Sequence, residues 1–332
     1  MGNYSVGISG IASYVPDRVL TNDDLSKMVD TSHEWIVERT GIEERRVADE
    51  KAASSDLGIQ AALKALEDAN TSPEEIDLVL VATATPDYLF PSTACIIQEA
   101  IGAKNAAAFD LEAGCSGFVY GLVTGGSFII SGAYKKVLVI GTETLSKIID
   151  WEDRNTCVLF GDGAGACVLE RCEEGYGILS FELGADGSGG ETLMVPAGGS
   201  KKPASLETVE NRDHYLKMDG REVFKFAARK MPEATINALN KANLTIEDLD
   251  FLVPHQANLR IIDAAAKKLK MDRDKILVTL SKYGNSSSAS IPLCLDEAVK
   301  DGKIKKGDNI VLVAFGAGLT WGSLALKWSK GD

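Results

Sequence analysis

The sequence predicts an α/β protein that contains two copies of one α/β unit. Short apolar, β-rich runs alternate with helical patterns, which is typical of buried, largely parallel sheets covered by helices. One constant shift along the chain aligns residues 77–80 with 250–253 and residues 137–140 with 310–313. The same shift aligns the helix predicted after Gly114 with the helix predicted after Ser287. We therefore divide the 332 residues into halves at 1–172 and 173–332, which together offer ample material for a buried core.

The elements follow from local patterns. The predicted strands are apolar runs at 77–83, 106–111, 136–141, 164–169, 177–182, 250–254, 309–315 and 322–328. The predicted helices have helical spacing of apolar residues and lie at about 54–69, 92–101, 116–131, 219–241, 258–269 and 288–300. Pro232 interrupts one helical pattern and predicts a kink or a junction. Residues 184–206 are rich in Gly, Ser and Pro and predict a loop or flap.

Charge and cysteine content narrow the classes of function. The net charge of −13 argues against general nucleic-acid binding, which needs a basic surface. The six cysteines form no CxxC pair, so we expect no zinc site and no disulfide framework. The N-terminal residues lack the pattern of a signal peptide, and we expect a reducing, cytoplasmic compartment. Residues 113–134 carry no charge, but their six glycines favour a closely packed internal helix over a membrane span.

Cys115 is the strongest candidate nucleophile. It follows the strand predicted at 106–111 and precedes an uncharged helix, so it lies in a tight strand-to-helix turn. The N-terminal end of a helix favours a thiolate, and we expect the pKa of this thiol to be lowered there. The flanking glycines permit close approach of a substrate. The alternative is that Cys115 is a small core residue, which is the interpretation we give to the other five cysteines.

Two further turns are candidate partners of this cysteine. His255 directly follows the strand at 250–254, where open α/β sheets place their ligands, although a structural histidine is as common as a catalytic one. Asn285 lies in a Gly-containing turn that the repeat shift places opposite the Cys115 turn. Gly316 follows the strand at 309–315 and can offer its N–H as an oxyanion donor. Cys, His and Asn from separate loops form a nucleophile with hydrogen-bond donors.

Six short motifs in this order resemble the β-ketoacyl-acyl-carrier-protein synthase III family of the thiolase superfamily. They are RTGIEERR at 39–46, AGCSG at 113–117, FGDGAGA at 160–166, PHQAN at 254–258, GNSSSAS at 284–290 and FGAGLTWG at 315–322. The family commonly has GNTSAAS at the fifth motif, a departure that leaves Asn285 intact. The resemblance covers essentially the whole chain and implies a duplicated βαβαβ core in five layers, α-β-α-β-α.

The resemblance also implies a reaction. Cys115 is expected to accept the acyl group of a primer acyl-CoA, with an oxyanion hole from the backbone N–H groups of Cys115 and Gly316. Malonyl-acyl-carrier protein then loses CO2, and donors from His255 and Asn285 stabilise the resulting enolate. The carbanion attacks the acyl group, which starts fatty acid biosynthesis. No metal or redox cofactor is expected, because acyl-CoA is a substrate.

Other residues match binding positions of the family. Trp35 and Arg154 match a pair that encloses the CoA adenine, and Thr31 and Arg39 match further CoA contacts. Three more positions, Lys225, Gln256 and Arg260, match contacts with the acyl carrier protein. The acidity of both proteins requires such a local basic patch, although a helix face with these charges is more often simply solvated. Phe90 matches a residue that reaches the partner's acyl pocket, which implies a homodimer.

Three alternatives remain open. An acyltransferase of specialised metabolism would use the same Cys-His-Asn set, and dependence on a carrier protein would distinguish it. A Cys-His-Asn hydrolase would turn over its acyl-enzyme without malonyl substrate. A non-catalytic binding module is disfavoured, because all the reactive residues are present. The sequence does not decide which primer is preferred.

Overall fold

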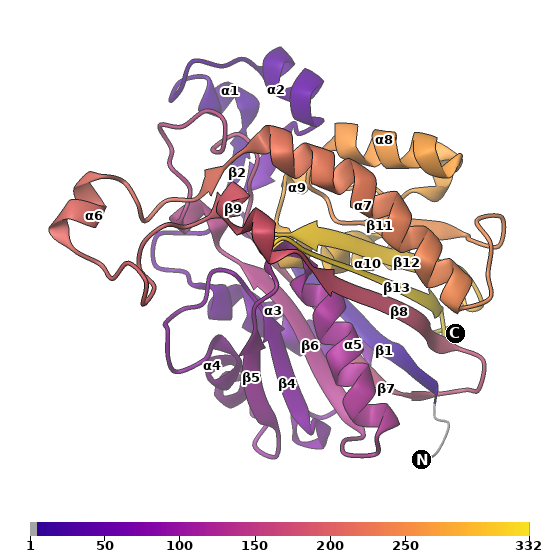
Figure 1. The fold of residues 1–332 in the computed structure, drawn as a ribbon. Coiled ribbons are helices and arrows are strands. Elements are labelled where there is room, and N and C mark those ends of the chain that lie inside the picture. The colour runs from indigo at the N-terminus through magenta and orange to yellow at the C-terminus, as the bar shows by residue number, and fades with distance from the viewer. Residues whose placement is uncertain (1–4, 332) are drawn as a thin grey trace.

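Two β-sheets lie in layers with helices between and outside them, in a computed structural model that describes residues 5–331 (Figure 1). The first sheet has the order β1-β7-β6-β4-β5 and comprises β1 (Ser5–Tyr14), β4 (Leu78–Ala82), β5 (Ala107–Leu111), β6 (Lys136–Glu143) and β7 (Gly163–Cys172). The second has the order β11-β12-β13-β8 and comprises β8 (Gly177–Ala185), β11 (Phe251–Pro254), β12 (Asn309–Gly316) and β13 (Thr320–Lys327).

The helices form three layers around these sheets. The outer face of the first sheet packs against α3 (Ser54–Asp68) and α4 (Thr93–Ala100). The space between the sheets holds α5 (Gly117–Ile130) and α10 (Ser290–Lys300), whose apolar residues share one core with strands of both sheets. The outer face of the second sheet packs against α7 (Gly220–Lys241) and α8 (Leu259–Leu269). The predicted five-layered α-β-α-β-α fold is therefore confirmed.

Glycines let α5 lie close to both sheets. A Cβ at Gly121 would come within 2.8 Å of Val139 on β6, and one at Gly126 would come within 2.9 Å of Ile178 on β8. Contacts that short do not occur between real atoms, so any larger residue would push the helix away from the strands. The uncharged stretch is thus an internal helix, as expected. No helix within residues 5–331 is long and apolar enough to cross a membrane.

The two sheets repeat one arrangement. In each sheet a parallel pair, β4–β6 or β11–β12, is extended by two antiparallel strands, β7 and β1 or β13 and β8. The shift that aligns the two halves of the sequence carries both ends of β6 onto the corresponding ends of β12. This agreement supports the division into halves 1–172 and 173–332, which remains a prediction.

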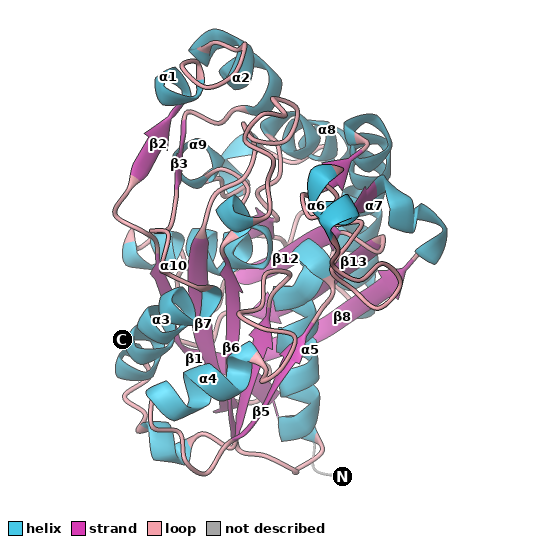
Figure 2. Cartoon of the chain, turned by 90° about the vertical axis from the view of Figure 1, so that its left-hand side faces the viewer, coloured by secondary structure: helices cyan, strands magenta, loops and turns pink. Residues whose placement is uncertain are grey.

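A smaller group of elements closes one end of the first sheet, visible at the top of Figure 2. Its apolar residues form a separate cluster that packs around the buried Arg45. The elements are β2 (Val19–Thr21), β3 (Glu44–Arg46), α1 (Asn22–Leu25), α2 (His33–Thr40) and α9 (Leu280–Tyr283). This group lies beside the carboxyl ends of the parallel strands, so it forms one wall of the region where a ligand is expected.

All eight predicted strands and all six predicted helices are present, with three corrections. The two sheets are mixed and not largely parallel, because four of their seven strand pairings are antiparallel. α7 continues through Pro232 as one helix, so no junction divides it. Residues 184–206 are not entirely loop, because they include the 3₁₀ turn Gly187–Thr192 and the short β9 (Leu193–Met194), which pairs with β10 (Lys217–Met218). A short helix, α6 (Leu206–Glu210), follows. The expectation about a signal peptide concerns in part residues 1–4, which lie outside the described residues.

Candidate active site

Cys115 lies in the middle of the 3₁₀ turn Gly114–Ser116 that leads from β5 into α5. Gly114 has φ = +52°, and a Cβ there would lie 2.8 Å from the backbone nitrogen of Ala317. Only glycine combines this left-handed backbone with such a close approach. The turn therefore brings Cys115 against the end of β12, and α5 begins directly after the turn.

The pKa of Cys115 differs from the expectation. Desolvation at this enclosed position raises the pKa of the thiol to about 12, although the Ser287 hydroxyl and the backbone of Cys115 itself lower it. Nearby acidic groups, Glu143 and Glu112, raise it further. The prediction of a lowered pKa was therefore wrong in its net direction, because burial outweighs the N-terminal position on the helix. The free site holds a neutral thiol, which must lose a proton before it can attack.

His255 lies directly after β11 and is buried. Burial lowers the pKa of its imidazole to about 3, so the ring is neutral near pH 7. Its Nδ1 lies 2.7 Å from Oγ of Ser290, which also accepts a hydrogen bond from the backbone N–H of Gln256. Nδ1 is the remaining partner for the Ser290 hydroxyl proton. This geometry assigns the ring proton to Nε2, which makes Nε2 a donor.

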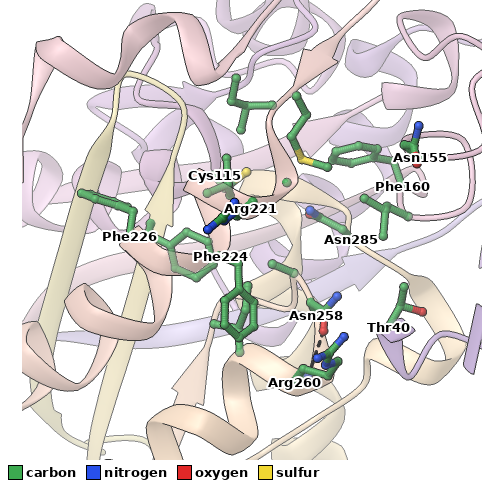
Figure 3. Close-up of a pocket in the computed structure, with 18 of the residues that line it drawn as sticks. Thr40, Cys115, Asn155, Phe160, Arg221, Phe224, Phe226, Asn258, Arg260 and Asn285 are labelled. Atoms are coloured by element: carbon green, nitrogen blue, oxygen red, sulfur yellow. Dashed lines mark hydrogen bonds between the residues drawn. The ribbon is translucent and has the colours of Figure 1, made fainter. Parts of the chain in front are cut away.

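Asn285 lies in the turn that follows α9. Its Oδ1 accepts a hydrogen bond from the backbone N–H of Ser287 at 2.9 Å. That contact fixes which end of the amide is oxygen. It leaves Nδ2 as a donor toward a cavity that Cys115 also lines. The side chains of Cys115 and Asn285 both face this cavity (Figure 3).

Gly316 ends β12 beside the nucleophile. A Cβ on this residue would lie 2.4 Å from the backbone nitrogen of Cys115, so a larger residue cannot fit without moving the turn. The two backbones that were predicted to form the oxyanion hole are therefore adjacent. Whether their N–H groups receive an oxyanion remains a prediction.

One cavity of about 780 Å³ joins these residues, and its lining includes Cys115, His255, Asn285 and Gly316. Apolar side chains such as Phe160, Leu193, Met218 and Phe224 form much of the remaining wall. Basic side chains line it too, and they are Arg39, Arg221, Lys225 and Arg260. An apolar cavity with a few convergent polar groups is the usual form of a small-molecule site.

The predicted CoA residues lie together at one side of this cavity. Trp35 and Arg39 line it, and the guanidinium of Arg39 lies 4.8 Å from the centroid of the Trp35 ring. Arg154 lies 5.0 Å from the same centroid and donates to the backbone oxygen of Asp30 at 2.7 Å. Thr31 is close in sequence and has a buried hydroxyl oxygen without a hydrogen-bond partner in the described chain. A base stacked between Trp35 and Arg154 needs about 3.5 Å on each side, so Arg154 must first move away.

The predicted carrier-protein contacts divide into two groups. Lys225 on α7 and Arg260 on α8 line the cavity, and Lys225 pairs with Glu222 at the surface. Gln256 is only 1% exposed, and its amide bonds internally to Pro254, Leu277 and Thr279. We correct this assignment: Gln256 braces the turn after β11 and cannot touch a docked protein.

Phe90 is 85% exposed. It is not among the residues that line the cavity of its own chain. Its neighbours Tyr88 and Leu89 are exposed as well. The structure contains one chain, and the contact of Phe90 with a partner's acyl pocket stays a prediction.

Three polar residues at the site were not found from the sequence. Ser290 orients His255, and the buried Glu143 and Ser287 shift the pKa of Cys115 in opposite directions. Serines in a Gly- and Ser-rich turn carry no signal of their own, and Glu143 follows a run of apolar strand residues without any motif. Only the repeat shift, which places β6 on β12, could have directed attention to Glu143 as the counterpart of Gly316.

A half-buried thiol, a neutral imidazole donor and an amide donor around one cavity are the groups that a condensing acyltransferase of the thiolase fold requires. Family models bear this out. The description "3-Oxoacyl-[acyl-carrier-protein (ACP)] synthase III" matches residues 109–187, and its C-terminal counterpart matches residues 239–328.

Known proteins agree with these matches. A curated β-ketoacyl-[acyl-carrier-protein] synthase III from Caldanaerobacter subterraneus subsp. tengcongensis is 61% identical, with 98% of each chain covered. The solved structure of 3-oxoacyl-[acyl-carrier-protein] synthase III from Aquifex aeolicus VF5 is 50% identical, with a TM-score of 0.90 over 97% of this chain and 100% of that one. A priming β-ketosynthase of the R1128 polyketide pathway is 36% identical, with a TM-score of 0.91 over 99% and 98%. The chain belongs to the β-ketoacyl-[acyl-carrier-protein] synthase III family.

Proposed function

We propose that this chain condenses a primer acyl-CoA with malonyl-acyl-carrier protein, releases CO2 and CoA, and so begins fatty acid synthesis. The observation that carries the proposal is the shared cavity of Cys115, His255 and Asn285. In the first step the sulfur of Cys115 attacks the thioester carbonyl. The adjacent backbones of Cys115 and Gly316 receive the developing oxyanion, and CoA leaves a thioester on the enzyme.

The second step uses the two donors. Loss of CO2 from the malonyl thioester places negative charge on the thioester oxygen. Nε2–H of His255 and Nδ2–H of Asn285 are oriented as donors by Ser290 and by the backbone of Ser287. They stabilise this enolate, and its carbon attacks the acyl group on Cys115. A neutral imidazole serves here at every pH above its lowered pKa of about 3.

We assign CoA binding to the Trp35 side of the cavity. The aromatic ring of Trp35 stacks with the adenine, while Arg39, Arg154 and the unpartnered hydroxyl of Thr31 contact the rest of the nucleotide. Arg154 exchanges its contact with Trp35 for one with the base. The reaction needs no resident cofactor and no metal, since both substrates are already activated as thioesters.

We assign carrier-protein docking to the mouth of the cavity between α7 and α8. Arg221, Lys225 and Arg260 line it there, in a chain whose net charge is −13. An acidic carrier protein is repelled by the chain as a whole and attracted by this basic face, which orients it toward the cavity.

We propose that two copies of the chain associate through the face that carries Phe90. Leu89 and Phe90 are the most exposed of the apolar side chains in this segment, and the edge strand β5 leaves side chains exposed near them. Pairing of such an edge with a second copy would cover both features. Sedimentation equilibrium tests this: the wild-type chain should be a dimer, and Phe90→Asp should shift it toward monomer. A wild-type monomer would contradict the proposal.

The state of the cysteines bears on the cellular location of the protein. All six cysteines are free thiols, which supports the proposed cytoplasmic location.

An acyltransferase of specialised metabolism with the same triad is the second candidate, which the 36% identity to a polyketide priming enzyme keeps open. The two differ in the partner that supplies the malonyl group.

Mass spectrometry of the intact protein tests the proposed roles together. Incubation with a panel of acyl-CoAs should add one acyl group, and malonyl-acyl-carrier protein should then remove it as a 3-oxoacyl product. Cys115→Ala should never carry the acyl group. His255→Ala and Asn285→Asp should be acylated but should lose about 10²-fold or more in the malonyl-dependent step. Full condensation by Cys115→Ala, or loss of acyl-enzyme to water alone in the wild type, would reject the mechanism.

A further inference from the structure

Glu143 is a buried carboxyl at the end of β6 that the proposed reaction does not use. It is 0% exposed, and none of the ion pairs described within residues 5–331 includes it. A carboxylate that leaves water without a cation beside it is costly, and such a group often keeps its proton instead. Burial raises the pKa of Glu143, and its hydrogen bonds offset that rise only in part. The partners of its two oxygens distinguish the two protonation states.

One oxygen of Glu143 accepts from a hydroxyl whose direction the structure settles. Oε2 lies 2.7 Å from the hydroxyl oxygen of Thr85 and 3.1 Å from the backbone nitrogen of Ala84. The Thr85 hydroxyl oxygen accepts the backbone N–H of Thr144 at 2.9 Å, and the nearby Ser54 hydroxyl donates to the Thr85 carbonyl at 2.6 Å. The hydroxyl proton of Thr85 is therefore free to point at Oε2, which makes Oε2 an acceptor.

The other oxygen, Oε1, meets a hydroxyl that has too few protons for its neighbours. It lies 2.8 Å from Oγ of Ser288, and the same Oγ lies 2.9 Å from the backbone oxygen of Ala82. Ser288 has a single hydroxyl proton for these two oxygens. If Glu143 were ionised, one of the two short contacts would hold no proton and would bring lone pairs together. With a proton on Oε1, Glu143 donates to Ser288 and Ser288 donates to Ala82, so both contacts are hydrogen bonds.

Ser288 connects this carboxyl to the turn that orients Asn285. The backbone N–H of the preceding residue, Ser287, donates to Oδ1 of Asn285 at 2.9 Å and so fixes the amide. The backbone of Asn285 is held separately, since its N–H donates to the carbonyl of Leu159 at 2.9 Å and its own carbonyl accepts from Gly161 at 3.0 Å. The orientation of the amide therefore depends on the turn, whereas the position of the main chain has its own support.

We propose that Glu143 is held as a neutral carboxylic acid and, through Ser288, positions the amide of Asn285 for the malonyl-dependent step. The inference rests on the proposed role of Asn285 as a donor to the enolate. Glu143 belongs to the first sheet and Ser288 precedes α10, so their hydrogen bond fixes the turn of one half against a strand of the other. Glu143 is a positioning residue, because it acts on the reaction only through this turn.

A neutral Glu143 also suits the negative charges that form during the reaction. The Coulombic effect by which Glu143 raises the pKa of Cys115 belongs to the carboxylate alone, so protonation removes it. The thiolate that attacks the acyl-CoA then meets one buried negative charge fewer. Glu112 is the other acidic group that raises the pKa of Cys115, and its side chain accepts a hydrogen bond from the backbone N–H of Gly114.

Separate measurement of the two half-reactions provides the first test. Glu143→Gln keeps the neutral arrangement, because its amide N–H can donate to Ser288 while its amide oxygen accepts from Thr85. Both half-reactions of this variant should stay within about threefold of the wild type. Glu143→Ala and Ser288→Ala release the turn. They should slow the malonyl-dependent step of isolated acyl-enzyme by about tenfold or more and leave acylation of Cys115 nearly unchanged. Ser286→Ala is the matched control, since its buried hydroxyl lies just before the turn and has no partner in the described chain.

Infrared spectroscopy provides the second test and does not depend on a rate. Near pH 7, the spectrum of the wild type minus that of Glu143→Gln should contain the carbonyl band of one carboxylic acid, which shifts in D2O. Carboxylate bands in its place would overturn the neutral acid, as would a Glu143→Gln variant that is as slow as Glu143→Ala in the malonyl-dependent step.

The positioning role has its own contradicting outcomes. An equal loss of both half-reactions in Ser288→Ala, full malonyl-dependent activity in Ser288→Ala, or an equal loss in Ser286→Ala would overturn it. A wild type that forms no acyl-Cys115, or whose acyl-enzyme does not condense with the malonyl substrate, would instead overturn the proposed function. The infrared result is independent of that failure, because it concerns the free protein.

Discussion

Two turns of the molecule, residues 114–116 and 287–289, have the same backbone and opposite chemistry. Both are 3₁₀ turns that lead into a helix of the central layer, α5 or α10. Both begin with a left-handed residue whose N–H bonds at 2.9 Å to a side chain just before the turn, Glu112 in one case and Asn285 in the other. One turn borders the substrate cavity, and the other is packed inside the protein.

The side chains at matching positions explain the difference. In one turn the central residue is Cys115, and it faces the backbone of Gly316 at the end of β12. In the other it is Ser288, and it faces the carboxyl of Glu143 at the end of β6. The glycine allows the end of β12 to approach the backbone of the Cys115 turn closely, whereas the glutamate places a hydrogen-bonded carboxyl beside the other turn. The same frame thus holds a candidate nucleophile on one side and a buried, hydrogen-bonded carboxyl on the other.

The largest expected effect comes from adding a side chain at Gly316, where the backbone of Cys115 approaches closely. Gly316→Ala places a Cβ 2.4 Å from the backbone nitrogen of Cys115, so the turn must shift and the oxyanion site is lost. We expect acylation to fall by about 10³-fold, measured by mass spectrometry with an acyl-CoA. Gly187→Ala is the control, because a Cβ there meets no atom within 4 Å and should leave the rate unchanged. Acylation by Gly316→Ala near the wild-type rate would show that the close approach is not needed.

A smaller effect is expected where the two halves differ at the start of the central helices. Ser290 begins α10 and bonds to His255, whereas the matching residue of α5 is Gly117, which packs closely on Ala82. Ser290→Ala removes the contact that holds the His255 proton on Nε2. We expect the malonyl-dependent step to slow by about tenfold while acylation is nearly unchanged. The two steps are measured separately on isolated acyl-enzyme. An equal loss in both would mean that Ser290 only supports the fold of the turn.

The fold was largely predictable because its strands are continuous apolar runs and its helices are strongly periodic. β1 was missed, since Gly7 and Gly10 weaken its apolar pattern. A Cβ at Gly10 would lie 2.4 Å from the backbone oxygen of Ala65 on α3, so glycine is required there for packing against a distant part of the chain. α2 was missed because its sequence, HEWIVERT, is mostly polar and only Ile36 and Thr40 are buried.

Parts of the site were not predictable, because they depend on contacts across the chain. The triad followed from motifs, and its convergence in one cavity agrees with the repeat. The direction of the Cys115 pKa shift was wrong, since enclosure by residues from both halves cannot be read from the local turn. Gln256 was misplaced because a polar residue beside a catalytic histidine resembles a binding residue until its amide is seen bonded inside the turn. Glu143 was missed because its hydrogen bonds to Thr85 and Ser288 join distant parts of the chain.

The smallest expected effect concerns the mouth of the cavity, to which the two halves contribute differently. The N-terminal half supplies Trp35 and Arg39, and the C-terminal half supplies Lys225 and Arg260. Lys225→Glu and Arg260→Glu should each raise KM for malonyl-acyl-carrier protein by about threefold and leave KM for the acyl-CoA nearly unchanged. Steady-state kinetics with each substrate varied in turn measures this, and added salt should reduce the difference.

Lys268→Glu is the charge-matched control, because Lys268 is exposed near the end of α8 and does not line the cavity. If all three reversals raise KM equally, the carrier protein responds to net charge and not to a docking face. If Lys225→Glu and Arg260→Glu raise KM for both substrates alike, the mouth is shared, and the division between a CoA side and a carrier side is wrong. A rise in KM for the carrier substrate alone would assign carrier-protein docking to the C-terminal half of the chain and the Trp35 side of the cavity to CoA.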